Sequence, residues 1–397
     1  FALSKAFDEF PHAPGIIIVE DDLLFSPDFL EYFHSVGPVL DVDDTAFVIS
    51  AWNDNGYRGR VDDPFALART EYFPGLGWLM SRKLYKGELE AKWPTQHWDH
   101  WLRSVEINRG REIIHPQVPR TYHNGIKGTF MDLNTHLKYF KNIAYNQDRK
   151  VSWNPVTATG SGGGGGGILP YSIGLSTAQK KDEQALRSLT LVPVPGADLS
   201  TPVPVYAQAV LSVYEERVHN LIAGCTHLRA VEDLATSLPV ELGDAAPTNE
   251  HDQKLQDSVV LCAWLNVDPE PPFGSPPFQG ISTLFGLWHE HRRGAHKGLH
   301  EFYWEGKYIL LLNTFQPATP AQGHGGTHGA HGRAKGTRSA GTGGDGAAAG
   351  HTGANKFSYS TYASLKPADV PVLPARSFNQ QLVQAISLKK RHNVLQE

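Results

Sequence analysis

Glycine is distributed unevenly along this chain, and that limits where its 397 residues can form a packed core. Six consecutive glycines occupy Gly162–Gly167, and the tract Gly323–Gly353 holds 12 glycines in 31 residues. Such stretches cannot bury enough apolar surface to offset the conformational entropy lost on folding. We therefore expect a first lobe over 1–147, a flexible Gly/Pro-rich insertion over 148–203, a second α+β lobe over 204–315, a disordered tract over 316–356 and a C-terminal segment over 357–397.

The charge balance and the cysteine count exclude several classes of protein. The chain carries 41 acidic and 36 basic residues, a net charge of −5, which argues against a nucleic-acid partner. No apolar run approaches the ~18 residues that a membrane-spanning helix needs. Two cysteines in 397 residues also exclude a small scaffold held together by disulfides.

The chain opens on Phe1–Phe7, a segment typical of the middle of an amphipathic helix, with no initiator methionine. We expect this sequence to be part of a longer protein.

The first lobe alternates strand and helix patterns. Residues 15–19 form a β-branched run without a polar side chain, as expected for a strand buried on both faces. Ser26 and Pro27 suit the N-cap and first position of a helix, and residues 47–50 predict a second strand. This order predicts an α/β fold with a mixed sheet.

The second lobe carries its own periodic patterns. Tyr206, Val210, Tyr214, Val218 and Leu221 share one helical stripe. Residues 258–265 predict a buried strand, and residues 302–304 and 308–312 predict a β-hairpin around Glu305–Lys307.

Four histidines and both cysteines belong to this second lobe. We expect His289, His291, His296 and His300 to lie at the surface. Cys225 and Cys262 could pair, but Cys262 sits inside the apolar strand, which favours two separate buried thiols.

Three consecutive acids, Glu20, Asp21 and Asp22, directly follow the first predicted strand. Ligand sites of open α/β sheets lie outside the carboxyl ends of strands, and oxygen ligands suit Mg²⁺ or Mn²⁺. The triplet therefore predicts a cation site that could also bind a diphosphate. The alternative is a solvated turn that caps the next helix.

A second carboxylate, Asp99, lies among Trp93, Trp98 and Trp101. Tryptophans beside a carboxylate can desolvate it and favour a general base, and their faces can bind a sugar ring. In the alternative, the tryptophans pack in the core and Asp99 is a surface charge. This alternative is favoured when the segment is taken alone. The loop Phe73–Trp78 has two glycines that allow close approach of a ligand, although a simple turn explains them equally well.

Seven strings in order and spacing resemble one family, the β-1,2-N-acetylglucosaminyltransferases that act on mannose. These strings are Ile18–Asp22, Ser26–Phe29, Ile49–Gly56, Phe73–Trp78, Lys92–Pro94, Trp98–Trp101 and Arg120–Tyr122. The resemblance covers roughly residues 1–145 and is weaker in the second lobe, where the string around Leu287–Leu299 resembles the O-mannose enzyme of the family.

The resemblance implies a GT-A type nucleotide-diphospho-sugar transferase fold, an inverting mechanism, UDP-GlcNAc as the donor and Mn²⁺ as the cofactor. It implies Asp22 as the metal ligand and Asp99 as the catalytic base. Glu20 and Asp21 would orient the donor, and Leu76 and Trp98 would line its sugar pocket. It further implies a mannose-bearing glycoprotein acceptor and a Golgi membrane location on the luminal face, through an anchor that this chain lacks.

Two alternatives remain open at this point. The acceptor could be a mannose of an N-glycan core, as for an alpha-1,3-mannosyl-glycoprotein 2-beta-N-acetylglucosaminyltransferase, or a protein O-mannose. A different class of function is a non-catalytic sugar-binding homologue, against which the presence of both Asp22 and Asp99 argues. A metal-dependent hydrolase of nucleotide-sugars is disfavoured by the aromatic residues around Asp99.

Overall fold

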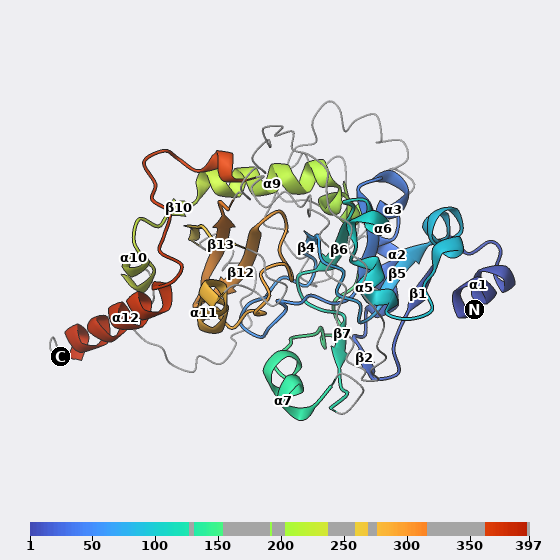
Figure 1. Ribbon diagram of the computed structural model, residues 1–397, viewed down its shortest axis with the longest axis horizontal. Coiled ribbons are helices and arrows are strands. Elements are labelled where there is room, and N and C mark those ends of the chain that lie inside the picture. The colour runs from blue at the N-terminus through green and yellow to red at the C-terminus, as the bar shows by residue number, and fades with distance from the viewer. Residues whose placement is uncertain are drawn as a thin grey trace, which may run out of the picture.

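A computed structural model describes residues 1–126, 131–153, 191–192, 203–236, 259–268, 276–315 and 362–394. We call the described residues up to 153 the first lobe, and those from 203 onward the second lobe (Figure 1). The expected disordered tract 316–356 lies outside the described residues, and so does most of the expected insertion. Among the described residues, no helix combines the length and apolar character needed to cross a membrane.

The first lobe contains the following elements in chain order: α1 (Ala2–Glu9), β1 (Gly15–Ile18), β2 (Leu23–Phe25), α2 (Phe29–Val36), α3 (Val39–Val42), β3 (Ala46–Ser50), β4 (Leu67–Thr70), β5 (Trp78–Ser81), α4 (Arg82–Leu84), η1 (Tyr85–Leu89), η2 (Glu90–Lys92), α5 (Trp98–Leu102), α6 (Val105–Asn108), β6 (Glu112–Pro116), β7 (Thr121–His123), α7 (Leu133–Thr135) and η3 (His136–Phe140). Five of the strands form one sheet in the order β1-β5-β3-β6-β4. Only β3 and β6 pair in parallel, so the predicted mixed α/β architecture is confirmed.

The first strand differs from its prediction. β1 lies at the edge of the sheet and pairs only with β5, and its four residues are half-buried. An edge strand has neighbours on one side only, so a β-branched run does not by itself imply burial on both faces. The expectation of a fully buried strand is therefore wrong.

The start of α2 also differs from its prediction. The helix begins at Phe29 with Asp28 at the N-cap position, two residues after the expected N-cap Ser26. The carboxylate of Asp28 makes no capping bond, because it accepts hydrogen bonds from Arg120, Asn146 and Trp153.

Trp153 extends the first lobe beyond residue 147. Its side chain is fully buried and packs against Tyr32 and Phe65. Its indole N–H donates to Asp28 at 2.8 Å. Trp153, which the sequence assigns to the insertion, therefore contributes to the core of the first lobe.

The second lobe contains η5 (Val205–Ala209), α9 (Leu211–Gly224), β10 (Thr226–His227), α10 (Val231–Thr236), β11 (Val260–Leu265), α11 (Pro276–Phe285), β12 (Leu299–Trp304), β13 (Lys307–Asn313), η6 (Ala363–Leu365) and α12 (Phe378–Val394). The short strands β8 (Leu191–Val192) and β9 (Val203–Pro204) pair with each other. A four-stranded sheet has the order β10-β11-β13-β12, with α9 and α11 on opposite sides of it (Figure 1). The predicted hairpin is confirmed as β12–β13, whose turn residues Glu305 and Gly306 both have positive φ.

Cys225 and Cys262 form a disulfide, so the preference for two separate thiols is wrong. β10 runs parallel to β11 with His227 opposite Cys262. This register brings Cys225 to a Cα–Cα distance of 5.9 Å from Cys262.

Three of the four histidines expected at the surface are buried: His291, His296 and His300 are at most 3% exposed. His291 and His300 pack on each other and on Phe278 of α11, whereas the loop that leads into β12 carries His296 to the first lobe. His296 Nε2 lies 3.1 Å from Glu112 Oε2.

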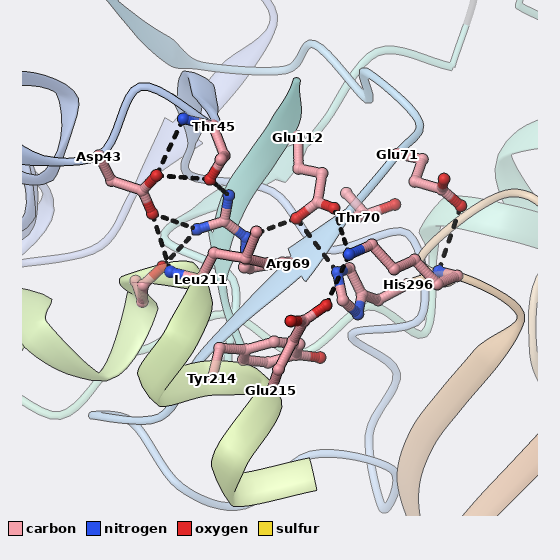
Figure 2. Close-up of polar contacts among 12 residues, drawn as sticks. Asp43, Thr45, Arg69, Thr70, Glu71, Glu112, Leu211, Tyr214, Glu215 and His296 are labelled. Atoms are coloured by element: carbon pink, nitrogen blue, oxygen red, sulfur yellow. Dashed lines mark hydrogen bonds and ion pairs between the residues drawn. The ribbon is translucent and has the colours of Figure 1, made fainter. Parts of the chain in front are cut away.

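A buried polar network joins the two lobes (Figure 2). Arg69 on β4 pairs with Asp43 at 3.0 Å and with Glu112 at 2.6 Å, all three side chains being buried. The backbone N–H of Leu211, at the start of α9, donates to Asp43 at 2.8 Å. Glu112 pairs in turn with His296, so Arg69 and its two carboxylates connect the first sheet to α9 and to the loop that leads into β12.

Candidate active site

The acidic triplet lies between β1 and β2, at the carboxyl end of β1. β2 pairs with β7 so that Leu23 faces His123, and the N–H of Asn124 donates to the carbonyl of Asp22 at 2.9 Å. This short ladder fixes the backbone of Asp22 beside the end of β7, far along the chain. His123 therefore lies next to the last acid of the triplet.

The Asp22 carboxylate and the His123 imidazole are in direct contact. Nε2 of His123 lies 3.0 Å from Oδ2 of Asp22. Burial lowers the pKa of His123, an effect that the Asp22 charge partly offsets. Burial therefore favours the neutral form of the imidazole, in which one ring nitrogen carries a lone pair.

Two atoms of this pair lack a partner among the described residues. Oδ1 of Asp22 and Nδ1 of His123 are buried and make no hydrogen bond there. Gly125 permits the close packing, because a Cβ at this position would lie 2.5 Å from Oδ2 of Asp22. Carboxylate oxygen and imidazole nitrogen are suitable ligands for Mn²⁺, so this pair could hold a divalent cation.

Glu20 connects the triplet with the other predicted site residues. Partial burial raises its pKa, and the carboxylates of Asp22 and Asp99 raise it further. A hydrogen bond with the backbone of Leu76 acts in the opposite direction. Glu20, Asp22, Leu76 and Asp99 therefore lie in one neighbourhood, as a shared site requires.

The loop Phe73–Trp78 has an unusual backbone. Gly75, Leu76 and Gly77 have φ values of 74°, 56° and 91°. A leucine with positive φ is strained, and such strain is concentrated at ligand-binding and catalytic sites. Thr121 holds the loop in place, since its hydroxyl donates to the carbonyl of Leu76 at 2.7 Å.

The helix α5 presents Trp98 and Asp99. The Trp98 ring stacks on Trp78 with 5.8 Å between centroids and meets Phe73 edge-on. The Asp99 side chain is 37% exposed and pairs with Arg103 at 2.8 Å. This geometry agrees with the alternative favoured for the segment alone, a surface carboxylate beside packed tryptophans, because Trp98 packs onto the Phe73–Trp78 loop and leaves the Asp99 carboxylate partly open to solvent.

Residues of the second lobe extend this neighbourhood. Trp288 stacks on Tyr139 at 4.4 Å and belongs to an aromatic cluster with Trp52 and Phe140, against which Leu76 packs. Arg293 lies over Trp288, with its Cζ 4.3 Å from the ring centroid. One wall of the candidate site is therefore shared between the two lobes.

Sequence reasoning missed His123, Arg103 and Trp288. Arg103 could have been found, because it stands four residues after Asp99 and such pairs meet on a helix. His123 gave no local signal, and Trp288 belonged to the Leu287–Leu299 string without an assigned role. Their positions depend on the β2–β7 ladder and on the contact between the lobes.

One further set of potential metal ligands exists among the described residues. Cys225, His227 and Cys262 place their ligand atoms within 4.8 Å of one another. Both sulfurs are bonded in the disulfide, which leaves His227 as the one available ligand of this set.

The order of these features along the chain matches a known family. Residues 1–157 match the GNT-I family. The GNT-I match contains the triplet, the loop Phe73–Trp78, α5 and His123, and it ends just past Trp153. The resemblance stated from the sequence is confirmed for this segment.

A curated relative of the GNT-I segment is the alpha-1,3-mannosyl-glycoprotein 2-beta-N-acetylglucosaminyltransferase of Arabidopsis thaliana. It is 43% identical over 138 residues, which cover 35% of this chain and 30% of the relative. The chain thus spans less than a third of the length of that relative.

Proposed function

We propose that this protein is an inverting glycosyltransferase that transfers GlcNAc from UDP-GlcNAc, in β-1,2 linkage, to a terminal mannose of a glycoprotein. The observation that carries this proposal is the placement of Glu20, Asp22 and Leu76 in one neighbourhood with Asp99. The GNT-I match and the name of the Arabidopsis relative support the same reaction. The mixed sheet with an acidic triplet after an edge strand is compatible with a GT-A type fold, which is part of the proposal.

Asp22 and His123 are the residues that would hold Mn²⁺. Their unpartnered buried atoms and their mixed oxygen and nitrogen donors fit such an ion. When bound, the cation neutralises the negative charge that develops on the departing diphosphate. The strand pairing of β2 with β7 fixes the distance between the two ligands before any metal binds.

Glu20, Asp21, Leu76 and Trp98 would bind the donor. A carboxylate such as Glu20 accepts hydrogen bonds from sugar or ribose hydroxyls, and its hydrogen bond with Leu76 fixes its position. Leu76 and Trp98 offer apolar surface to the sugar from the loop and from α5.

Asp99 would be the catalytic base. Inversion requires one group that removes the proton of the mannose 2-hydroxyl while that oxygen attacks the anomeric carbon. The bond from this carbon to the diphosphate breaks, and the proton stays on the Asp99 carboxylate. The solvent exposure of Asp99 fits this role, because an acceptor can reach it without a rearrangement of α5.

The acceptor is either an N-glycan mannose or a protein O-mannose. The name of the relative favours the α-1,3-linked mannose of an N-glycan, which is our first proposal. We further propose the luminal face of the Golgi membrane as the location, because the resemblance implies it.

The direct test is transfer from radiolabelled UDP-GlcNAc, with Mn²⁺, to an α-1,3-mannosyl glycan and to an O-mannosyl peptide. We expect a product with one β-linked GlcNAc on the 2-hydroxyl, identified by NMR, on the glycan. Transfer to the peptide alone would assign the O-mannose reaction instead. Donor binding without transfer to either acceptor would overturn the proposal in favour of a non-catalytic sugar-binding homologue.

A further inference from the structure

Arg103 contacts the candidate base Asp99, the carbonyl of Phe73 and the ring of Tyr72. Its Nη1 donates to Oδ2 of Asp99 at 2.8 Å, and its Nε donates to the carbonyl of Phe73 at 3.0 Å. Its Cζ lies 4.8 Å from the ring centroid of Tyr72. One guanidinium therefore links α5, which carries Asp99, to the start of the loop that carries Leu76.

Tyr72 contacts a second cation, which belongs to the other lobe. Cζ of Arg293 lies 4.6 Å from the centroid of the same Tyr72 ring. Arg293 also pairs with Asp54 at 3.4 Å and with Glu290 at 3.2 Å. Its backbone carbonyl accepts a hydrogen bond from Asn55 at 3.0 Å, which anchors the loop to the first lobe.

The charges in this arrangement are balanced. Two guanidinium groups on one ring would repel each other, but each has its own carboxylate: Asp99 for Arg103, and Asp54 for Arg293. The aromatic ring attracts both cations through its quadrupole. The arrangement therefore holds Arg103 in one place with few competing partners, because its side chain is only 17% exposed.

We propose that Arg103 and Tyr72 are positioning residues for Asp99, and that Arg293 of the second lobe completes this arrangement. The inference rests on the proposed role of Asp99 as the base. A base must lie within hydrogen-bond reach of the proton that it accepts, and displacement by about 1 Å can cost roughly 100-fold in rate. The second lobe would then contribute to the rate of the chemical step through the contact of Arg293 with Tyr72.

The test compares Tyr72→Leu, Tyr72→Phe and Arg103→Lys in the purified protein. Leucine removes the ring, and lysine cannot reach Asp99 and the Phe73 carbonyl at once, so kcat should fall about 10–100-fold in both. The Kd of UDP-GlcNAc with Mn²⁺, measured by calorimetry, should stay within about twofold, since Asp22 and the pocket walls are unchanged. Tyr72→Phe keeps the ring and should restore most of the kcat lost in Tyr72→Leu.

Arg82→Lys is the matched control. Arg82 lies over the Phe7 ring at 4.7 Å and donates to backbone carbonyls of Ala13 and Phe7, at the opposite end of β1 from the triplet. The Arg82→Lys substitution should lower the melting temperature and leave kcat unchanged. Three results would each overturn the inference. Tyr72→Leu could keep the wild-type kcat, Tyr72→Phe could lose as much kcat as Tyr72→Leu, or donor affinity could fall in parallel with kcat.

Hydrogen exchange of the α5 amides separates this inference from the proposed function. Tyr72→Leu and Arg103→Lys should exchange faster over 98–103, and Tyr72→Phe should not. If the wild-type protein transfers no sugar, the proposed function fails, while faster exchange would still show that Tyr72 holds α5. Unchanged exchange together with wild-type kcat in these variants would leave the function intact and refute the positioning role.

Discussion

Nε of Arg69 lies 2.6 Å from Oε2 of Glu112, with both side chains buried, where the sheet of the first lobe meets the second lobe (Figure 2). The same guanidinium pairs with Asp43, and Glu112 also contacts His296 and Lys297. Buried charges without partners are costly, so each member of this group depends on the others. The two lobes should therefore unfold together.

The first prediction concerns Arg69. Arg69→Met keeps much of the side-chain volume but leaves Asp43 and Glu112 without their main cation. We expect a loss of about 3–5 kcal/mol in the free energy of unfolding, measured by urea denaturation. Lys83→Met is the control, because Lys83 pairs with Asp44 at the surface, and it should change stability by less than about 1 kcal/mol. An Arg69→Met protein as stable as this control would contradict the role of the network.

The second prediction uses the two carboxylates beside Lys297. Burial and the Glu112 charge raise the pKa of Glu71 from 4.5 to about 7, although contacts with Lys297 and Arg292 oppose this. The pKa of Glu112 is about 2: burial acts to raise it, but the charges of His296, Arg69 and Lys297 outweigh that effect. The unfolded chain releases the Glu71 proton near pH 4.5 and the folded chain near 7, so the Glu71 contribution to stability falls as pH rises from 4.5 to 7.

Glu71→Gln, which stays neutral, should remove this decline. Urea denaturation at pH 5 and pH 7.5 should show a smaller difference in the variant than in the wild type. Glu112 acts in the opposite sense, since its stabilisation is present above pH 4.5 and is lost as pH falls toward 2. An identical pH dependence in Glu71→Gln and the wild type would refute the raised pKa of Glu71.

A third prediction concerns the proposed base. Asp99→Asn keeps size and shape but cannot accept a proton, so turnover should fall by roughly 10²–10⁴ while the KM for UDP-GlcNAc moves little. Trp98→Ala should reduce both donor affinity and rate. Asp44→Asn, at an exposed carboxylate of the first lobe, is the control. Near-normal turnover in Asp99→Asn would place the base elsewhere, with His97 and His100 as the next candidates.

The proposed metal pair gives a fourth prediction. His123→Ala should weaken Mn²⁺ binding by about 10–100-fold, and Asp22→Ala should weaken it further, because the carboxylate carries the negative charge. Electron paramagnetic resonance of free Mn²⁺ measures both without any sugar transfer. His34→Ala, an exposed histidine on α2, should bind Mn²⁺ as the wild type does. Equal binding by His123→Ala and His34→Ala would show that His123 is not a ligand.

The disulfide gives a fifth prediction. Cys225 and Cys262 are separated by 37 residues, and closing a loop of this length in the unfolded chain corresponds to about 4 kcal/mol. Cys225→Ser combined with Cys262→Ser should lower the free energy of unfolding by an amount of that order. A double variant as stable as the oxidised wild type would contradict it.

Local sequence patterns were sufficient to predict several helices and strands, but they did not predict which segments pack against one another. The strand Ala46–Ser50 and the β12–β13 hairpin followed from short runs and turn residues, because those signals are contained within a few positions. The edge position of β1 and the burial of His296 did not follow, since both depend on which segments pair across the chain. The Cys225–Cys262 disulfide was not predicted for the same reason, because it depends on the register of β10 against β11.

The candidate site divides in the same way. The sequence singled out the acidic triplet because it follows a strand, and Asp99 because it lies among tryptophans. The family resemblance then assigned both to one site. Their roles stay predictions, as do those of Glu20, Asp21, Leu76 and Trp98. His123 could not be predicted from the sequence, because only the pairing of β2 with β7 places it beside Asp22.

The burial of Trp153 determines where this chain can be cut. A fragment that ends at residue 147 would leave the Asp28 carboxylate and the Arg120 guanidinium facing a hole the size of an indole, since Trp153 packs over both. Cavities left by tryptophan cost about 3–5 kcal/mol, enough to abolish the yield of a small recombinant domain. A proteolytic cut or a cloning boundary placed after Trp153 would preserve that packing, so any shortened form of the protein that ends near this point should retain this one aromatic residue.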